Sequence, residues 1–250
     1  MISKNKISDI RKLHQKKFRD AEQLFIVEGR KCVEALLQSD FEVLDIYATE
    51  ANAKENQHLL GKRQVTLVTD AEMERISTLS TPPALLAVAR QSTRRVNIPD
   101  EEPVLVLDRI ADPGNLGTIA RTADWFNIRH IVCSPDCVEF YSPKTIQATM
   151  GSFAHVHVQY RPLVPYLREQ SSRRRVLGAF LAGESIRSFG FQSSDIIVIG
   201  SESHGISPEV EECVTRKITI PSVHTGPDTA ESLNAAVATA ILLYQAAAKF

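Results

Sequence analysis

Continuous apolar runs in the second half of the chain predict a parallel β-sheet. Four such runs stand at 104–107, 130–133, 176–180 and 196–199. Strands that do not alternate with polar positions are typical of a sheet buried on both faces. Helical periodicity separates the runs, at 118–127, 142–149 and 232–248. We therefore expect an α/β domain with a parallel sheet in this half of the chain.

Shorter elements alternate in the first half and predict a second, smaller α/β domain. Strands are expected at 24–27, 41–48, 64–69 and 85–89. Helices are expected over 29–38 and from Asp70 onward. Residues 91–103 have no apolar periodicity and contain two prolines and an acidic cluster. We place the domain boundary there, with an N-terminal domain over 1–97 and a C-terminal domain over 104–250.

Composition agrees with an ordinary globular protein, because 43% of residues are hydrophobic and 24% are charged. The longest apolar run, 235–244, is about half of the roughly 20 residues that a membrane span needs. The first residues lack the apolar core of a secretory signal, so we expect a cytoplasmic protein with no membrane contact. The four cysteines form no CxxC pair. We therefore expect buried free thiols and assign no metal.

Charge is distributed unevenly although the net charge is only −1. The first 31 residues hold nine basic and four acidic side chains. Such a segment can bind nucleic acid, but charge alone favours a solvated helix face or loop.

Candidate chemistry gathers in three segments that follow predicted strands: 112–123, 200–209 and 218–240. Glycines in the first two let the backbone approach a ligand, and helix N-termini offer free N–H groups. Neither GxGxxG nor GxxxxGK[ST] occurs, which disfavours the usual dinucleotide and phosphate-loop sites. With a helix beginning near Thr118, Asn115 is expected in the preceding loop and Arg121 one turn into the helix.

Each segment also has an ordinary structural interpretation when it is taken alone. Asn115 could form a turn, and Arg121 could pair with an acidic neighbour. Glu202 could be a surface carboxylate. Ser232 resembles a helix cap, and the alanine-rich helix after it could simply fill the core.

Taken as an ordered set, the three segments resemble the SpoU/TrmH branch of the SPOUT RNA methyltransferase superfamily. The residues that carry the resemblance are Asn115, Gly117, Arg121, Thr122 and Ala123, then Gly200, Glu202 and Gly205, then Pro221, Ser232, Leu233 and Asn234. The chain departs from the family at Ser201, where an asparagine is usual. It departs again at 222–231, which is longer than usual and lacks a methionine.

The resemblance implies S-adenosylmethionine-dependent methylation of a ribose 2′-hydroxyl in structured RNA, ribosomal rather than transfer RNA. It implies a deep trefoil knot, against the general rule that chains do not thread, and a homodimer through the C-terminal domain. The implied catalytic residues are Arg121, Asn115, Glu202, Ser232 and Asn234. The implied cofactor-binding residues are Gly200, Glu202, Gly205, Ile220, Pro221 and Leu233. A guanidinium stays protonated in proteins, so we expect Arg121 to bind a phosphate and stabilise the developing alkoxide.

The N-terminal domain resembles the family's RNA-binding module more loosely. Its expected phosphate contacts are Lys12, Lys16, Lys17, Arg19 and Arg30. Two alternatives stay open at this point. One is a transfer RNA 2′-O-methyltransferase. The other is a non-catalytic RNA-binding or ribosome-assembly protein on the same fold, which the altered third segment favours.

Overall fold

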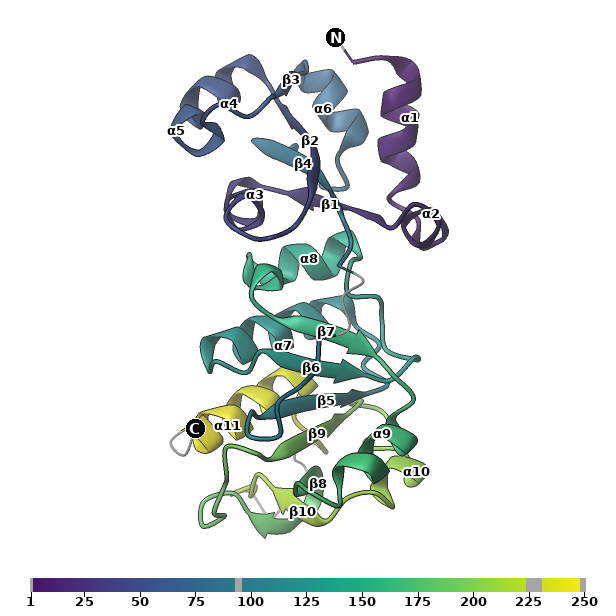
Figure 1. Cartoon of the computed structure of the whole chain (residues 1–250), viewed down its shortest axis with the longest axis vertical. Helices are drawn as coiled ribbons and strands as arrows, with labels where there is room; N and C mark the ends of the chain where they lie inside the picture. Colours follow the sequence, from purple (N-terminus) through teal and green to yellow (C-terminus); the bar gives the residue numbers. More distant parts are fainter. Residues whose placement is uncertain (1, 93–95, 224–230, 248–250) are drawn as a thin grey trace. The chain divides into compact units, whose positions relative to one another are not determined.

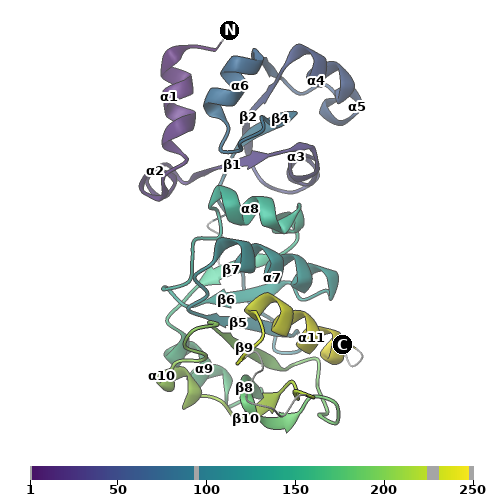
Figure 2. The ribbon, with the colours of Figure 1, turned by 180° about the vertical axis from the view of Figure 1, so that it is seen from behind.

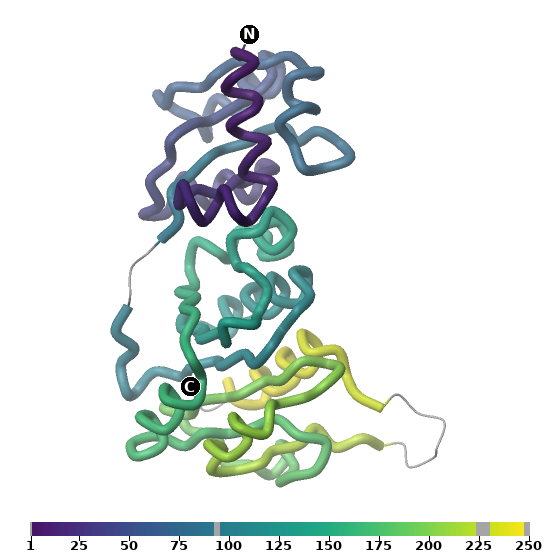
Figure 3. The backbone as a smooth tube through the Cα atoms, turned by 90° about the vertical axis from the view of Figure 1, so that its right-hand side faces the viewer, coloured from purple at the N-terminus to yellow at the C-terminus, as the bar shows by residue number. Residues whose placement is uncertain are grey.

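The computed structural model describes residues 2–92, 96–223 and 231–247, and Figure 3 follows the backbone through them. The chain divides into two compact units. Unit 1 contains Met1–Arg94 together with Glu139–Ala154, and unit 2 contains Arg95–Val138 and His155–Phe250. A stretch from within the predicted 104–250 domain therefore folds as part of unit 1.

Unit 1 is built on a four-stranded sheet with the order β1-β4-β2-β3 (Figure 1). Its strands are β1 (Leu24–Glu28), β2 (Val43–Ala48), β3 (Thr66–Leu67) and β4 (Leu85–Arg90). Strand β4 runs antiparallel to β1 and β2, whereas β3 runs parallel to β2. The predicted strand at 64–69 shrinks to β3, because this edge strand pairs with β2 through two residues alone.

The helices of unit 1 are α1 (Lys4–Lys12), α2 (Lys16–Glu22), α3 (Arg30–Leu37), α4 (Glu50–Glu55), α5 (Gln57–Leu60), α6 (Asp70–Ile76) and α8 (Pro143–Thr149), with the 3₁₀ turn η1 (Ser152–Ala154). Side-chain caps fix several helix starts. Ser3 accepts the N–H of Lys6 at α1, and Thr69 and Glu72 form a capping box at α6. Apolar side chains from α1 and α6 meet the sheet in one buried cluster.

The segment Glu139–Ala154 completes unit 1 through aromatic packing. The ring of Phe25 in β1 lies 4.7 Å from that of Tyr141 and 6.0 Å from that of Phe153, measured between centroids. Gly151 packs so closely on α3 that an added Cβ would lie 3.0 Å from the Cβ of Ala35. The core of unit 1 therefore depends on chain that follows β6 of unit 2 in the sequence.

Unit 2 is built on a six-stranded sheet with the order β10-β8-β9-β5-β6-β7, in which every pair is parallel. The strands are β5 (Val104–Asp108), β6 (His130–Cys133), β7 (His157–Tyr160), β8 (Val176–Ser185), β9 (Ile196–Gly200) and β10 (Arg216–Thr219). The four predicted strands are confirmed. Strand β7 was not predicted, because its short sequence mixes polar and apolar residues.

Helices cover both faces of this sheet, as its buried strands require. They are α7 (Pro113–Trp125), α9 (Leu163–Gln170), α10 (Pro208–Glu211) and α11 (Ala235–Ala247). Figure 2 shows α7 and α11 side by side, and they pack against each other. Helices α9 and α10 pack on the apolar cluster that includes Val104, Val106 and Val198. The predicted α/β class with a parallel sheet is confirmed.

Helix α7 begins at Pro113 rather than near Thr118, and this is a correction to the sequence analysis. Asp112 caps the helix by accepting the N–H of Asn115 at 2.8 Å, and Pro113 occupies its first position. Asn115 therefore lies in the first turn of the helix rather than in a loop. The predicted knot depends on the path of 224–230, which lies outside the described residues, so it stays a prediction.

Candidate active site

Strand order directs the site to one place along the sheet. Strand β5 lies between β6 and β9. The chain continues from β5 toward β6 and from β9 toward β10, in opposite directions along the sheet, which leaves a crevice at the carboxyl ends of β5 and β9. Ligands of open α/β sheets bind at such a reversal of strand order. The first two candidate segments follow β5 and β9, and the third ends at the start of α11.

Three of the predicted catalytic side chains meet at this edge. The Nδ2 group of Asn115 donates to Oε1 of Glu202. Nδ2 of Asn234 donates to Oδ1 of Asn115 at 3.0 Å and approaches Oε1 of Glu202 at 3.5 Å. The backbone N–H of Ala235 donates to the same carboxylate oxygen at 3.3 Å. We call Asn115, Glu202 and Asn234 the polar triad.

Helix α11 is capped by a member of this triad rather than by Ser232, which is a second correction. Oδ1 of Asn234 accepts the backbone N–H groups of Ala236 at 2.9 Å and Val237 at 3.3 Å. One amide side chain thus closes the helix start and binds the other two triad members. The positions of the triad side chains therefore depend on the position of the start of α11.

A cavity of about 660 Å³ opens beside the triad. This volume lies within the range of roughly 300–1,000 Å³ that is usual for small-molecule sites. Of the predicted cofactor-binding residues, the cavity is lined by Gly200, Glu202, Gly205, Ile220 and Leu233. Ser232 lines it as well, whereas Pro221 is not among the lining residues.

Gly200 is required by the close approach of the loop that follows β9. A Cβ atom at Gly200 would lie 2.1 Å from the carbonyl carbon of Gly205. Ser201 and Gly205 exchange both backbone hydrogen bonds across this turn, at 2.8 and 3.2 Å, and Gly205 has a φ of +64°. The tight turn therefore needs glycine at both positions.

One wall of the cavity was missed by the sequence analysis. It is formed by Phe180, Leu181 and Ala182 in the second half of β8. There the pairing with β10 jumps from Gly178 to Glu184, so the intervening residues leave the ladder. Gly183 lies against the backbone of Lys217, where an added Cβ would be 2.7 Å from the carbonyl oxygen. The glycines at 178 and 183 were the sequence feature from which this irregularity of β8 could have been predicted.

Arg121 is separate from the triad within one chain. It lies on the exposed side of α7, one turn before Trp125, and it does not line the cavity. Among the described residues it has no hydrogen bond or ion pair. An exposed, unpaired guanidinium can bind an anion that another molecule brings.

Four of the five predicted RNA-binding residues lie at least partly exposed in unit 1. Lys12 pairs with Asp9 at 2.8 Å and Lys16 with Asp20 at 3.7 Å. Lys17 lies over the ring of its neighbour Phe18, and Arg30 is exposed at the start of α3. Exposed ion pairs of this kind contribute about 1 kcal/mol or less, so they do not prevent phosphate binding.

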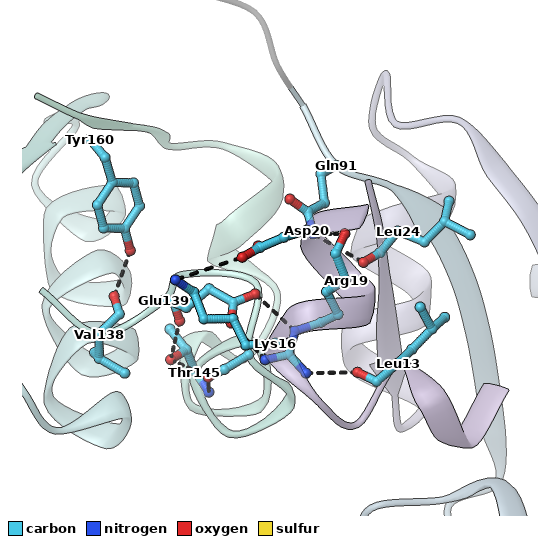
Figure 4. Close-up of polar contacts among 11 residues, drawn as sticks. Leu13, Lys16, Arg19, Asp20, Leu24, Gln91, Val138, Glu139, Thr145 and Tyr160 are labelled. Carbon is cyan, nitrogen blue, oxygen red and sulfur yellow. Dashed lines mark hydrogen bonds and ion pairs between the residues drawn. The ribbon is translucent and has the colours of Figure 1, made fainter. Parts of the chain in front are cut away.

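Arg19 is the exception and a third correction. Its side chain is 4% exposed, and its Nε and Nη2 donate to the two carboxylate oxygens of Glu139 at 2.8 and 2.6 Å (Figure 4). Nη1 donates to the carbonyl of Leu13 at 2.7 Å. The guanidinium therefore holds α2 to the segment Glu139–Ala154 and is not available to RNA.

Comparison with known proteins decides the family. Residues 102–244 match the model of the SpoU rRNA Methylase family. The chain belongs to the SpoU rRNA methylase family. Residues 4–87 match the MRM3-like substrate binding domain.

Relatives of the SpoU family resemble the chain over nearly its whole length. The 23S rRNA (guanosine(2553)-2′-O)-methyltransferase RlmP of Bacillus subtilis is 30% identical over 96% of this chain and 94% of its own. A TrmH-family RNA methyltransferase structure from Porphyromonas gingivalis is 36% identical, with a TM-score of 0.86 over 98% of both chains. An AdoMet-bound rRNA methyltransferase from Sinorhizobium meliloti is 26% identical, with a TM-score of 0.82 over 98% of this chain and 95% of that one.

The cavity fits the methyl donor of the SpoU family by charge. S-adenosylmethionine carries a sulfonium, an ammonium and one carboxylate. The described lining carries the carboxylates of Glu202 and Glu231, and that of Glu211, which pairs with the ammonium of Lys217. Apolar side chains such as Ile199, Ile218 and Leu242 supply the remaining wall, which suits a purine and an aliphatic chain.

Proposed function

We propose that this protein transfers a methyl group from S-adenosylmethionine to a ribose 2′-hydroxyl of ribosomal RNA. The observation that carries the proposal is the polar triad, whose Glu202 lines a cavity that suits the methyl donor by charge. Membership of the SpoU family and the 23S ribosomal RNA activity for which the Bacillus subtilis relative is named support the ribosomal substrate. We place this activity in the cytoplasm.

The triad would position the reacting groups. The cofactor supplies an electrophilic methyl group, and displacement at that carbon requires the ribose oxygen in line with the bond that breaks. Glu202 is held by three N–H donors, so its carboxylate has a fixed direction at the cavity wall. Gly200, Gly205, Ile220 and Leu233 would hold the cofactor, and Ser232 would contact the ribose.

Arg121 would complete the site from a second copy of the chain. Helix α7 exposes Trp125 one turn after Arg121, and α11, which packs against α7, exposes Val237, Ile241 and Tyr244. We call these four apolar side chains the apolar row. Trp125 is 84% exposed and Tyr244 is 72% exposed, which is unusual for large apolar side chains in a row. A homodimer through this face would bury the row and bring each Arg121 toward the partner's triad. There it would bind a phosphate and stabilise the developing alkoxide.

RNA would first bind through the basic side chains of unit 1. We propose Lys12, Lys16, Lys17 and Arg30 for this role, because all four are accessible to a phosphate. The match of residues 4–87 to a substrate binding domain supports this placement.

The function is tested by mapping 2′-O-methyl groups in total RNA from cells with and without the gene. We expect one ribosomal RNA position to lose its mark in the deletion strain and to regain it on complementation. A lost mark in transfer RNA instead would overturn the substrate class. Unchanged maps, together with failure of the purified protein to bind S-adenosylmethionine, would overturn the enzyme itself.

Arg121→Ala should abolish methyl transfer while leaving the affinity for S-adenosylmethionine within about twofold. The physical reason is that Arg121 acts on the RNA and the developing charge, outside its own chain's cavity. Calorimetric titration of the cofactor and incorporation of labelled methyl into RNA measure the two effects separately. A parallel loss of both would contradict this role. Arg129→Ala, an exposed arginine at the opposite edge of the sheet, is the control.

A further inference from the structure

Arg109, the residue directly after the central strand β5, has a left-handed backbone with a φ of +58°. Three other non-glycine residues share this conformation among the described residues: Gln23, Asn127 and Met150. Gln23 and Met150 are the C-caps of α2 and α8, and Asn127 follows the C-cap of α7. Helix ends commonly place one residue in this region, so those three have a structural reason. Arg109 has no such reason.

The turn at Arg109 is held in place by the loop after β6. The backbone N–H of Arg109 donates to Oγ of Ser134 at 2.9 Å. The next N–H, of Ile110, donates to Sγ of Cys137 at 3.3 Å. Left-handed backbone is unfavourable for a residue with a long side chain, and it persists where neighbouring contacts fix it. Such positions concentrate at functional sites.

The neighbouring Asp108 fixes both ends of the loop that lines the cavity. Asp108 is the partner of Gly200 in the β5–β9 ladder. Its Oδ2 also accepts the backbone N–H of Ser207 at 2.7 Å, and the residue is 3% exposed. The loop from Gly200 to Ser207 therefore begins and ends at Asp108. Arg109 stands at the base of this loop, at the carboxyl edge where β5 and β9 meet.

The guanidinium of Arg109 has free hydrogen-bonding capacity at this edge. Its side chain is 35% exposed, and its Nε lies 3.7 Å from Oδ1 of Asp108, beyond hydrogen-bonding distance. Nε is buried and has no hydrogen-bond partner in the part of the chain that the structure describes. Arg109 therefore pairs with Asp108 by charge alone, and its side-chain donors have no hydrogen-bond acceptor among the described residues. Arg109 does not line the cavity, so the cofactor's carboxylate is not its natural partner.

We propose that Arg109 binds a phosphate of the RNA beside the target ribose. This inference rests on the proposed function and adds a substrate-positioning residue to it. A guanidinium on a fixed turn can donate two parallel hydrogen bonds to one phosphate. Binding there fixes the sugar relative to the methyl donor, whereas the lysines of unit 1 fix the RNA as a whole.

Arg109→Asn separates this role from a structural one, because asparagine tolerates the left-handed region. We expect an unchanged Tm, or one raised by about 2–4 °C, and cofactor affinity within about twofold. The KM for in vitro transcribed ribosomal RNA of the source organism should rise about tenfold or more. The slope of log affinity against log salt should fall by about one. Arg109→Lys should keep that slope, and Arg129→Asn should behave like the native protein.

Two results would overturn the inference. One is an Arg109→Asn protein with native KM and native salt slope on RNA that the native protein methylates, which leaves the proposed function intact. The other is loss of Tm and of cofactor affinity in Arg109→Asn, which would make Arg109 structural. No methyl incorporation by the native protein on any RNA would overturn the proposed function, and this inference with it.

Discussion

At the scale of single residues, Glu202 is the centre of the site. One of its carboxylate oxygens accepts hydrogen bonds from Asn115, Asn234 and the backbone of Ala235, which belong to the starts of two different helices. A carboxylate has only acceptors, so it can satisfy several donors at once. An amide of the same shape keeps one acceptor oxygen but has no negative charge, so its hydrogen bonds to these three donors are weaker.

Glu202→Gln should therefore reduce methyl transfer about 100-fold, because small misplacements of positioning groups have effects of that size. The free energy of unfolding should fall by only about 1 kcal/mol, since the triad is exposed to water. Labelled methyl incorporation and urea denaturation give the two values. Glu209→Gln, an exposed carboxylate in the helix that follows the same loop, serves as the control. Native methyl-transfer activity of the Glu202→Gln protein would show that the triad does not contribute to the reaction.

At the scale of elements, the cavity is shaped by a turn after β9 and by the irregular second half of β8. The turn is closed by hydrogen bonds between Ser201 and Gly205, and Gly200 lies directly under it. A side chain at Gly200 would displace the turn, because the contact is with backbone rather than with a flexible side chain.

We expect Gly200→Ala to weaken S-adenosylmethionine binding at least tenfold and to lower the free energy of unfolding by about 1–3 kcal/mol. Gly190→Ala is a matched control, because nothing lies within 4 Å of a Cβ atom built there. Calorimetric titration and thermal denaturation of both variants check this. Equal behaviour of the two proteins would show that the turn adapts without cost.

The sequence was sufficient for elements whose residues carry their own signal. Buried strands such as β5 and β9 were predicted because unbroken apolar runs are typical of strands that are buried on both faces of a sheet. The wall formed by β8 was not, because its departure from the ladder depends on the neighbouring strand. The burial of Arg19 was also hidden, since its partner Glu139 stands 120 positions away in the sequence. Local pattern cannot report a contact whose other half is distant.

At the scale of the whole molecule, RNA affinity should depend on charge in unit 1. Replacing Lys16 and Lys17 together by glutamate should lower RNA affinity at least tenfold at low salt. It should also flatten the salt dependence, because fewer counterions are released on binding. Filter binding over a series of salt concentrations measures both. Lys54→Glu with Lys62→Glu, two exposed lysines elsewhere in unit 1, should have little effect. Equal losses of RNA affinity in the two double variants would mean that RNA binding depends on the total charge of unit 1 and not on one defined surface.

Self-association should depend on the apolar row of α7 and α11. Trp125→Glu combined with Tyr244→Glu should convert a dimer into a monomer of 27.8 kDa, because two buried charges would oppose the contact. Light scattering after size-exclusion chromatography reads the mass directly. Leu67→Glu changes an exposed leucine of unit 1 and should leave the mass unaltered. A native protein that is already monomeric would rule out a site shared between two chains.

The aromatic packing of Tyr141 and Phe153 against Phe25 limits where the chain can be divided into fragments that fold. A fragment that stops near the linker after residue 92 would lack two rings of its own core. A fragment that begins there would carry the same rings with their apolar partners removed, and such surfaces favour aggregation. Replacing the N-terminal part of unit 1 by that of a relative should therefore give a folded protein only when residues 139–154 are replaced with it.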